Sequence, residues 1–187
     1  PALAGVGSHT ITYTYTAPNA CLNTAQANVI VHAQPQVSIS GLNNLYCEND
    51  PSVGLTLTPS SGASLTGPGI VGSSFSPSNA GLGQSSIQLN YTDSNGCSNS
   101  FSQVVKVSEV FPVSSIQGFK RVLKSRQYTY SVEAVNGAAY QWTVINGTLV
   151  AQANNVATIA WGTVKDGRII VTQTSLDGCS DSTEAFI

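Results

Sequence analysis

The stretch that decides the fold is residues 77–107, PSNAGLGQSSIQLNYTDSNGCSNSFSQVVKV, because the chain contains it more than once. Residues 1–31, PALAGVGSHTITYTYTAPNACLNTAQANVIV, align with it without a gap at a spacing of 76 residues, and 12 of the 31 positions are identical. The shared positions are turn formers, apolar residues and one cysteine, Cys21 in the first copy and Cys97 in the second. The chain is therefore built from repeats.

A third, more divergent copy surrounds Cys179. Residues 174–182 (TSLDGCSDS) resemble residues 92–100 (TDSNGCSNS) at a spacing of 82 residues. Between the copies, Gln34-Pro35 and Phe111-Pro112 each follow a strand-like run, and proline does not continue a strand inside a sheet. We therefore predict boundaries between modules near these two prolines.

Apolar and polar residues alternate with a period of two. Residues 10–16 (TITYTYT) and 86–92 (SIQLNYT) alternate cleanly, and residues two apart lie on the same face of a strand. The pattern recurs in residues 53–58, 127–132, 140–145 and 156–161. About seven short strands in ~75 residues, with turn signals between them, are typical of an immunoglobulin-like sandwich. We predict an all-β chain of tandem β-sandwich modules arranged as beads on a string.

Three segments follow from the repeats and the prolines. Residues 1–34 are predicted to be the C-terminal part of a truncated immunoglobulin-like (Ig-like) repeat, residues 35–110 a complete repeat, and residues 111–187 a further module. The first segment supplies only the closing strands of a sandwich, whose edges would be unpaired. Either upstream chain completes that sandwich, or another subunit donates the missing strands, as in fibre-forming proteins.

Composition excludes several classes of function. Charged residues make up 9% of the chain and the formal net charge is −2, whereas a nucleic-acid-binding protein needs a basic field. No run approaches the roughly 18 apolar residues that a membrane span requires. The chain has no methionine and no signal peptide at its start, so we expect a processed chain or a piece of a longer one.

The four cysteines suggest one disulfide. Cys47 and Cys97 fall in the same copy of the repeat and are 50 residues apart, and such a bond would stabilise the fold by roughly 4 kcal/mol. We predict a Cys47–Cys97 disulfide, the alternative being two unpaired buried thiols. Cys21 is expected to pair upstream of residue 1, and at least one of Cys21 and Cys179 to be unpaired unless they bond to each other. Disulfides in small β domains imply an extracellular setting.

The same disulfide would create a candidate calcium site. Glu48 and Asp50 follow Cys47, and Asp93 and Asn95 precede Cys97. A Cys47–Cys97 bond would bring these oxygen donors to one end of the sandwich, where Ca²⁺ could bind them. The alternative is a polar loop end with an Asx-turn at Asp93. No other metal site and no other cofactor is predicted.

The sequence does not predict an enzyme. The two histidines, His9 and His32, lie at strand ends, and the sequence places no carboxylate or nucleophile beside either. The run GPGIVG at residues 67–72 has the spacing of a dinucleotide-binding loop, but no helix follows it. We expect these glycines to form turns.

Two tryptophans and a basic cluster are candidate contacts for a glycan or a partner protein. Trp142 lies in the middle of a predicted strand, where Ig-like sandwiches place a core tryptophan. Trp161 ends a strand and is open to either role, core packing or sugar stacking. Four of the seven basic residues lie within seven positions, Lys120, Arg121, Lys124 and Arg126. They could contact an acidic polysaccharide, a lipid head group or a neighbouring module, or form a solvated loop.

Residues 67–98, GPGIVGSSFSPSNAGLGQSSIQLNYTDSNGCS, resemble a tandem repeat of very large Bacteroidetes surface proteins. Such proteins carry Ig-like and PKD-like modules and include the gliding-motility adhesins of the type IX secretion pathway. Residues 113–187 are similar to a PKD-like module, on the evidence of Tyr128, Tyr130, residues 140–142 and residues 159–162. The resemblance implies export, surface display and repetition, and it implies no ligand. Leu123 stands where such modules often carry a cysteine, so an in-module partner for Cys179 is not expected.

The resemblance also gives a candidate modification site. Asp181-Ser182-Thr183 fits the short context of O-glycosylation in this phylum, which makes Ser182 the candidate residue.

Two functions from different classes remain. The first is a non-catalytic stalk or spacer in a very large secreted cell-surface adhesin, for which the resemblance suggests a link to gliding motility. Its partners would be neighbouring repeats of the same chain, other adhesin subunits or surface polysaccharide. The second is a glycan-binding module that uses Trp161 and the basic cluster. Strand donation between subunits of a fibre or filament is a further alternative.

Overall fold

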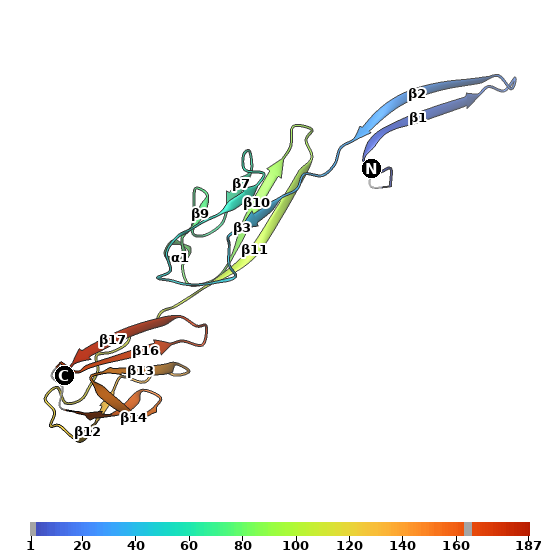
Figure 1. Ribbon diagram of the computed structural model, residues 1–187. Coiled ribbons are helices and arrows are strands. Elements are labelled where there is room, and N and C mark those ends of the chain that lie inside the picture. The colour runs from blue at the N-terminus through green and yellow to red at the C-terminus, as the bar shows by residue number, and fades with distance from the viewer. Residues whose placement is uncertain (1–2, 163–165) are drawn as a thin grey trace. The chain divides into compact units, whose positions relative to one another are not determined.

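The computed structural model describes residues 3–162 and 166–187, and nearly all of its regular secondary structure is β-strand (Figure 1). The only helix among the described residues is α1 (Pro77–Ala80), a single turn. The all-β prediction is confirmed. The chain forms two compact units, the first from residues 1–42, 53–75 and 86–103 and the second from residues 43–52, 76–85 and 104–187.

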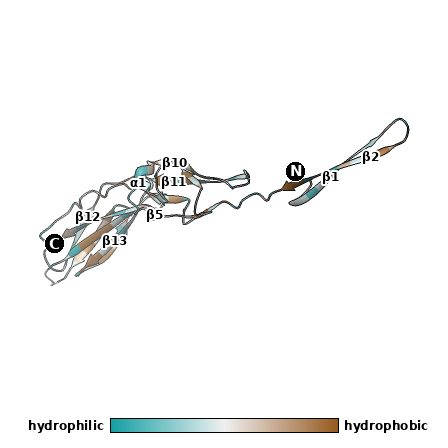
Figure 2. Ribbon diagram, turned by 90° about the horizontal axis from the view of Figure 1, so that it is seen from above, coloured by the Kyte–Doolittle hydropathy of each residue, from teal (hydrophilic) through white to brown (hydrophobic). Residues whose placement is uncertain are grey.

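The N-terminal strands, β1 (Gly7–Thr16) and β2 (Leu22–Val31), form a two-stranded antiparallel sheet. They pair in continuous register from Gly7 opposite Val31 to Thr16 opposite Leu22. Most of their side chains are exposed. Several of these residues are nevertheless hydrophobic, as the brown parts of the two strands show (Figure 2). Ile11, Tyr13 and Val29 are 58%, 66% and 43% exposed.

The corresponding strands of the second copy are β10 (Gly83–Thr92) and β11 (Ser98–Ser108), and here the same positions are buried. Ile87, Leu89 and Val105 occupy the positions of Ile11, Tyr13 and Val29, and each of them is 0% exposed. The repeated sequence therefore forms the same hairpin twice, with its apolar side chains buried in only one of the two copies.

The rest of the second copy consists of short strands. They are β3 (Ser38–Ser40), β4 (Leu45–Cys47), β5 (Val53–Gly54), β6 (Thr56–Thr58), β7 (Ser64–Thr66), β8 (Ile70–Val71) and β9 (Ser74–Phe75). The sheet orders are β4-β11-β10-β7, β3-β6 and β5-β9-β8. β4 lies parallel to the end of β11, with Cys47 opposite Ser108.

The C-terminal sandwich, within the second unit, has two three-stranded sheets. One contains β12 (Arg126–Ser131), β15 (Val156–Trp161) and β14 (Gly147–Ala153), and the other contains β13 (Ala139–Ile145), β16 (Arg168–Thr174) and β17 (Ser180–Phe186). Inward-facing residues alternate along each strand, as the period of two predicts. The core consists of Ile116, Tyr130, Val132, Trp142, Ala157, Ile159, Trp161, Ile169 and Val171.

Candidate functional site

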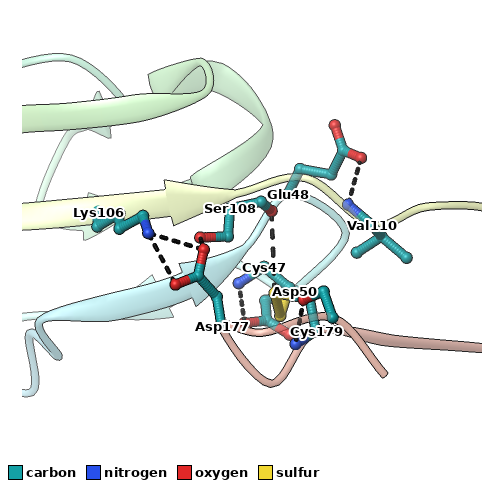
Figure 3. The surroundings of a disulfide bond; sticks show 9 residues. Cys47, Glu48, Asp50, Lys106, Ser108, Val110, Asp177 and Cys179 are labelled. Atoms are coloured by element: carbon teal, nitrogen blue, oxygen red, sulfur yellow. Dashed lines mark hydrogen bonds and ion pairs between the residues drawn. A yellow bond between two sulfur atoms is a disulfide. The ribbon is translucent and has the colours of Figure 1, made fainter. Parts of the chain in front are cut away.

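A disulfide between Cys47 and Cys179 is the most distinctive chemical feature of the second unit (Figure 3). The bond is 2.02 Å long, the two Cα atoms are 5.5 Å apart, and 132 residues separate the cysteines in sequence. Cys47 ends β4, and Cys179 ends the turn that precedes β17. The bond therefore connects a loop of the second repeat to the last hairpin of the chain.

The predicted Cys47–Cys97 disulfide is wrong, because Cys97 and Cys21 are both free thiols. Cys47 lies opposite Ser108, the last residue of β11, whereas Cys97 immediately precedes the first residue of that strand. An 11-residue strand is roughly 33 Å long at ~3.3 Å per residue. Cysteines in a disulfide have Cα atoms within about 7 Å of each other, so the two ends of one long strand cannot be bridged.

Hydrogen bonds hold the loop around Cys47. The backbone N–H of Cys47 donates to a carboxylate oxygen of Asp50 at 2.8 Å. The backbone N–H of Glu48 donates to the carbonyl of Ser108 at 3.0 Å, and the Glu48 carboxylate accepts from the backbone N–H of Val110 at 2.9 Å. Glu48 thus contacts both the end of β11 and the segment that leaves it (Figure 3).

An ion pair lies beside the disulfide. The Lys106 Nζ donates to both carboxylate oxygens of Asp177 at 2.7 Å, and the Ser108 hydroxyl donates to one of them at 2.7 Å. The Lys106 contact, followed by the Ser108 hydrogen bond, lowers the pKa of Asp177 below its ordinary value. Both charged side chains remain partly exposed, so the pair is screened by salt. These contacts connect the turn that carries Cys179 to the end of β11.

A pocket of about 230 Å³ adjoins this ion pair and was not predicted from the sequence. Its walls include Phe111, Val135, Leu176 and Asp177. Leu176 is 89% exposed. No local pattern marks these residues, because they come from three loops that are distant in the sequence.

The structure gives the predicted calcium ligands other roles. Asp50 accepts from the backbone N–H of Cys47 in its own loop, and Glu48 accepts from the backbone N–H of Val110 in the segment that leaves β11. One oxygen of Asp93 accepts from the backbone N–H groups of Asn95 and Cys97, both at 2.9 Å. The Asx-turn alternative at Asp93 is thus what the structure contains. Residues 3–162 and 166–187 contain no group of three or more His, Cys, Asp or Glu side chains that could hold a metal ion. The predicted site depended on the Cys47–Cys97 bond, which does not form.

Trp161 belongs to the core, which is one of the two roles that the sequence left open for it, and the glycan contact is the alternative that the structure does not support. The residue is 4% exposed, and its Nε1–H donates a 2.9 Å hydrogen bond to the hydroxyl of Tyr130. A Cβ atom at Gly147 or Gly167 would lie 2.7 or 2.5 Å from the Trp161 ring, so both glycines make room for it. Trp142 is 2% exposed and has the core role that was predicted. A buried ring has no free face on which a sugar could stack.

The basic cluster is exposed. Lys120, Arg121, Lys124 and Arg126 all lie on the surface between the isolated bridge at Gln117 and the start of β12. Phe119 and Leu123, in the same segment, are 67% and 68% exposed. The segment therefore presents four positive charges and two apolar side chains to solvent, and a contact with a partner remains a prediction.

Ser182 is exposed on β17, and the neighbouring Asp181 accepts a 3.0 Å hydrogen bond from the backbone N–H of Val113. The O-glycosylation of Ser182 stays a prediction.

A ring nitrogen of His9 lies 2.9 Å from the carbonyl of Gly5. The expectation that the protein is non-catalytic also stays a prediction.

Comparison with known proteins agrees with the fold. Residues 110–187 match the model of a family described as a PKD-like domain. No curated protein matches the sequence. No helix in the described part of the chain is long and apolar enough to cross a membrane.

Several solved structures are similar at low identity. SGBP-B of the Bacteroides ovatus mixed-linkage glucan utilization locus, in complex with a mixed-linkage heptasaccharide, is 13% identical with a TM-score of 0.28, over 94% of this chain and 47% of that one. Extracellular cadherin domains 1–4 of protocadherin gamma B7 are 11% identical with a TM-score of 0.30, over 97% and 57%. The human desmocollin-1 ectodomain is 10% identical with a TM-score of 0.28, over 96% and 43%. The chain spans about half the length of each of these proteins.

The match of residues 110–187 to a PKD-like domain agrees with the two three-stranded sheets of the C-terminal sandwich. Modules of this kind serve many functions on one fold.

Proposed function

We propose that the chain is a stalk segment of a very large secreted cell-surface adhesin, in which consecutive modules act as a mechanically resistant spacer. The observation that carries the proposal is the Cys47–Cys179 disulfide, which joins a cysteine of the predicted repeat of residues 35–110 to a cysteine of the predicted module of residues 111–187. The repeated hairpin supports it as well, because repetition lengthens a stalk without adding a new site.

The disulfide has a direct mechanical consequence. A force applied to the two ends of the chain passes from Cys47 to Cys179 through the sulfur atoms, so the 132-residue interval between them cannot be extended. At ~3.5 Å per extended residue, this interval is roughly 460 Å of chain. Most of the chain is thus protected from unfolding under tension, which is what a spacer between an anchor and a distal binding site needs.

The proposed location is the outside of the cell. A disulfide of this kind persists in an oxidising compartment, as found in secreted and surface proteins. The resemblance to Bacteroidetes surface proteins adds type IX secretion and a link to gliding motility to this proposal. Neighbouring repeats and surface polysaccharide are the proposed partners.

Single-molecule extension tests the mechanical role. The chain is held at both termini and pulled with and without reductant. We expect an additional release of roughly 460 Å of contour length only after reduction, on the basis of ~3.5 Å per residue. Cys47→Ser should release this length without reductant, and Cys97→Ser, the matched control, should behave like the wild type. Equal extension of oxidised and reduced wild-type chains would refute the spacer mechanism.

The mass of the natural polypeptide tests the stalk assignment separately. We expect the protein purified from its source without reductant to have a mass far above the 19.4 kDa of this sequence. A mass near 19.4 kDa would contradict the stalk and favour a subunit completed by its neighbour.

Exposure of the basic cluster supports a second candidate function, the binding of an acidic polysaccharide. Lys120, Arg121, Lys124 and Arg126 lie beside exposed Phe119 and Leu123, and such a surface attracts polyanions at low salt. Retention on an immobilised uronic-acid polysaccharide should fall when the four basic residues are changed to glutamine. Arg168→Gln, which removes one positive charge elsewhere, is the control. Unchanged retention in the quadruple variant would exclude the cluster as the binding surface.

The hairpin of β1 and β2, whose apolar side chains are exposed, supports a third candidate, strand donation within a fibre. Ile11, Tyr13 and Val29 are exposed, whereas their three counterparts in β10 and β11 are buried. Burial of such residues is favourable by about 25 cal/mol per Å². If a second copy supplies the missing strands, sedimentation should detect dimers or longer fibres at micromolar concentration. Ile11→Asp should reduce the association, and monomers at all concentrations would exclude this candidate.

A further inference from the structure

The three hairpin turns that end in a cysteine have the same backbone geometry. They are residues 17–21, 93–97 and 175–179. In each turn the N–H of the first residue donates to the carbonyl of the cysteine, at 2.8, 3.0 and 2.8 Å respectively. The residue before the cysteine donates to the carbonyl of the first residue, at 2.9, 3.1 and 3.0 Å. That residue has a left-handed backbone each time, with φ of 64° at Ala20, 82° at Gly96 and 87° at Gly178.

Cys21, Cys97 and Cys179 therefore occupy one structural position, and their states differ. Cys179 is bonded to Cys47 and is 2% exposed. Cys97 is a half-buried free thiol and Cys21 is an exposed one. Because the three turns have the same geometry, whether the cysteine is bonded or free depends on whether a second thiol lies within bonding distance.

The strand that follows each of the last two cysteines binds the segment that enters its own module. Asn99, two residues after Cys97, donates from its side-chain amide to the carbonyl of Pro35 at 2.8 Å. Asp181, two residues after Cys179, accepts from the backbone N–H of Val113 at 3.0 Å. The segments entering the second and third modules are thus both held next to a cysteine turn.

The repeat indicates where a partner thiol for Cys97 would lie. Cys47 is opposite Ser108, at the end of the strand that leads into the third module. The residue 76 positions before Ser108 is His32, which immediately follows the last residue of β2, the strand that leads into the second module. A cysteine in the position of Cys47 in the preceding copy would lie next to His32, as Cys47 lies next to Ser108.

We propose that Cys97 is the downstream half of an inter-module disulfide of the Cys47–Cys179 kind. Its partner is the cysteine of the preceding copy of the repeat that corresponds to Cys47, and Cys21 bonds in the same way to the copy before that. Consecutive modules are then joined by staggered disulfides, and no copy contains a bond of its own. Residues 111–187 have a single cysteine, Cys179, so this module receives a bond from the module before it and provides no thiol to one after it.

The chemistry is thiol–disulfide exchange. Two thiols lose two protons and two electrons and form one S–S bond, while a disulfide oxidant is reduced to two thiols. Oxidised glutathione serves as that oxidant in the test. The proposal goes beyond the stalk assignment, since it concerns which cysteines pair and holds for a binding module as well.

An extended chain tests the pairing. A second copy of residues 35–76 is fused ahead of Pro1, which reproduces the Ser76-Pro77 connection and adds one cysteine. After oxidation, peptide mapping without reductant is expected to find the added cysteine bonded to Cys97, Cys47 bonded to Cys179, and Cys21 free. A bond from the added cysteine to Cys21 would overturn the proposal. In the control, the same fusion with serine in place of the added cysteine, Cys97 should remain open to alkylation.

Folding of the added segment is monitored independently. Amide exchange at Ile11 and Tyr13 should slow when the added strands cover β1. If these amides are protected and the added cysteine stays reduced, the proposal is overturned. If these amides are not protected, the pairing of Cys97 is tested with the variant His32→Cys of the original chain. It should block alkylation of Cys97 after oxidation, whereas the control Thr24→Cys should not, and continued alkylation of Cys97 in His32→Cys would refute the proposal.

Discussion

Cys47 and Cys179 are joined by a disulfide although 132 residues separate them, and Lys106 and Asp177 form an ion pair beside the bond. The bond closes a large loop of chain, and closing a loop removes conformational freedom from the unfolded state. Both stability and response to force should depend on it.

Removal of the disulfide should destabilise the protein. The double variant Cys47→Ser/Cys179→Ser is expected to lower the free energy of unfolding by a few kcal/mol. The entropy of closing the loop sets an upper limit of about 5 kcal/mol on this loss. The measurement is urea unfolding without reductant. Cys97→Ser, which removes a free thiol, should leave the midpoint nearly unchanged. A double variant as stable as the wild type would contradict the structure.

The ion pair should make stability depend on pH. The folded-state pKa of Asp177 is lowered, mainly by Lys106. The stabilisation is therefore fully present above the ordinary carboxyl pKa of about 3.9 and is lost as the pH falls through the lowered value. Wild type should be more stable than Asp177→Asn at pH 6 and low salt, and the difference should disappear near pH 2. Glu109→Gln, a nearby exposed carboxylate, is the control, and a pH-independent difference would contradict the assignment.

Gly147 should not tolerate a side chain. A Cβ atom there would lie 2.7 Å from the ring of Trp161, and overpacking of this kind costs about 1–3 kcal/mol. Thermal unfolding of Gly147→Ala should give a lower midpoint than the wild type. Gly54→Ala is the matched control, because a Cβ atom at Gly54 meets nothing within 4 Å. Equal midpoints for the two variants would show that Trp161 is not packed against Gly147.

The hydroxyl of Tyr130 should matter for the same core. It accepts from Trp161 Nε1–H at 2.9 Å and donates to the carbonyl of Phe119 at 3.0 Å. Burial raises the pKa of Tyr130. Tyr130→Phe leaves both partners without this contact and should lower the free energy of unfolding by about 1–3 kcal/mol. Tyr13→Phe, at an exposed position, should have little effect, and similar losses in both variants would contradict this account.

The strands were predictable from the sequence because their signal is local. The alternation in residues 156–161 coincides with β15, that in residues 140–145 lies within β13, and the repeat in residues 77–107 identifies the β10–β11 hairpin. A period of two requires only that one face of each strand be buried. The core position of Trp142 follows from the same alternation.

Neither the Cys47–Cys179 disulfide nor the burial of Trp161 could be decided from the sequence, because both depend on contacts between segments that are far apart in the sequence. β4 has three residues and pairs in parallel with the end of β11, so no local pattern shows that Cys47 lies at the end opposite to Cys97. Trp161 is buried because Gly147 and Gly167 approach its ring. The calcium prediction failed with the Cys47–Cys97 bond on which it depended.

The most direct test of this account is a peptide map of the oxidised protein, alkylated under native conditions and digested without reductant. We predict a single cross-linked species that joins the peptides of Cys47 and Cys179, with Cys21 and Cys97 recovered in alkylated form. A cross-link between Cys47 and Cys97, with Cys179 alkylated, would contradict both the proposed spacer mechanism and the staggered disulfides.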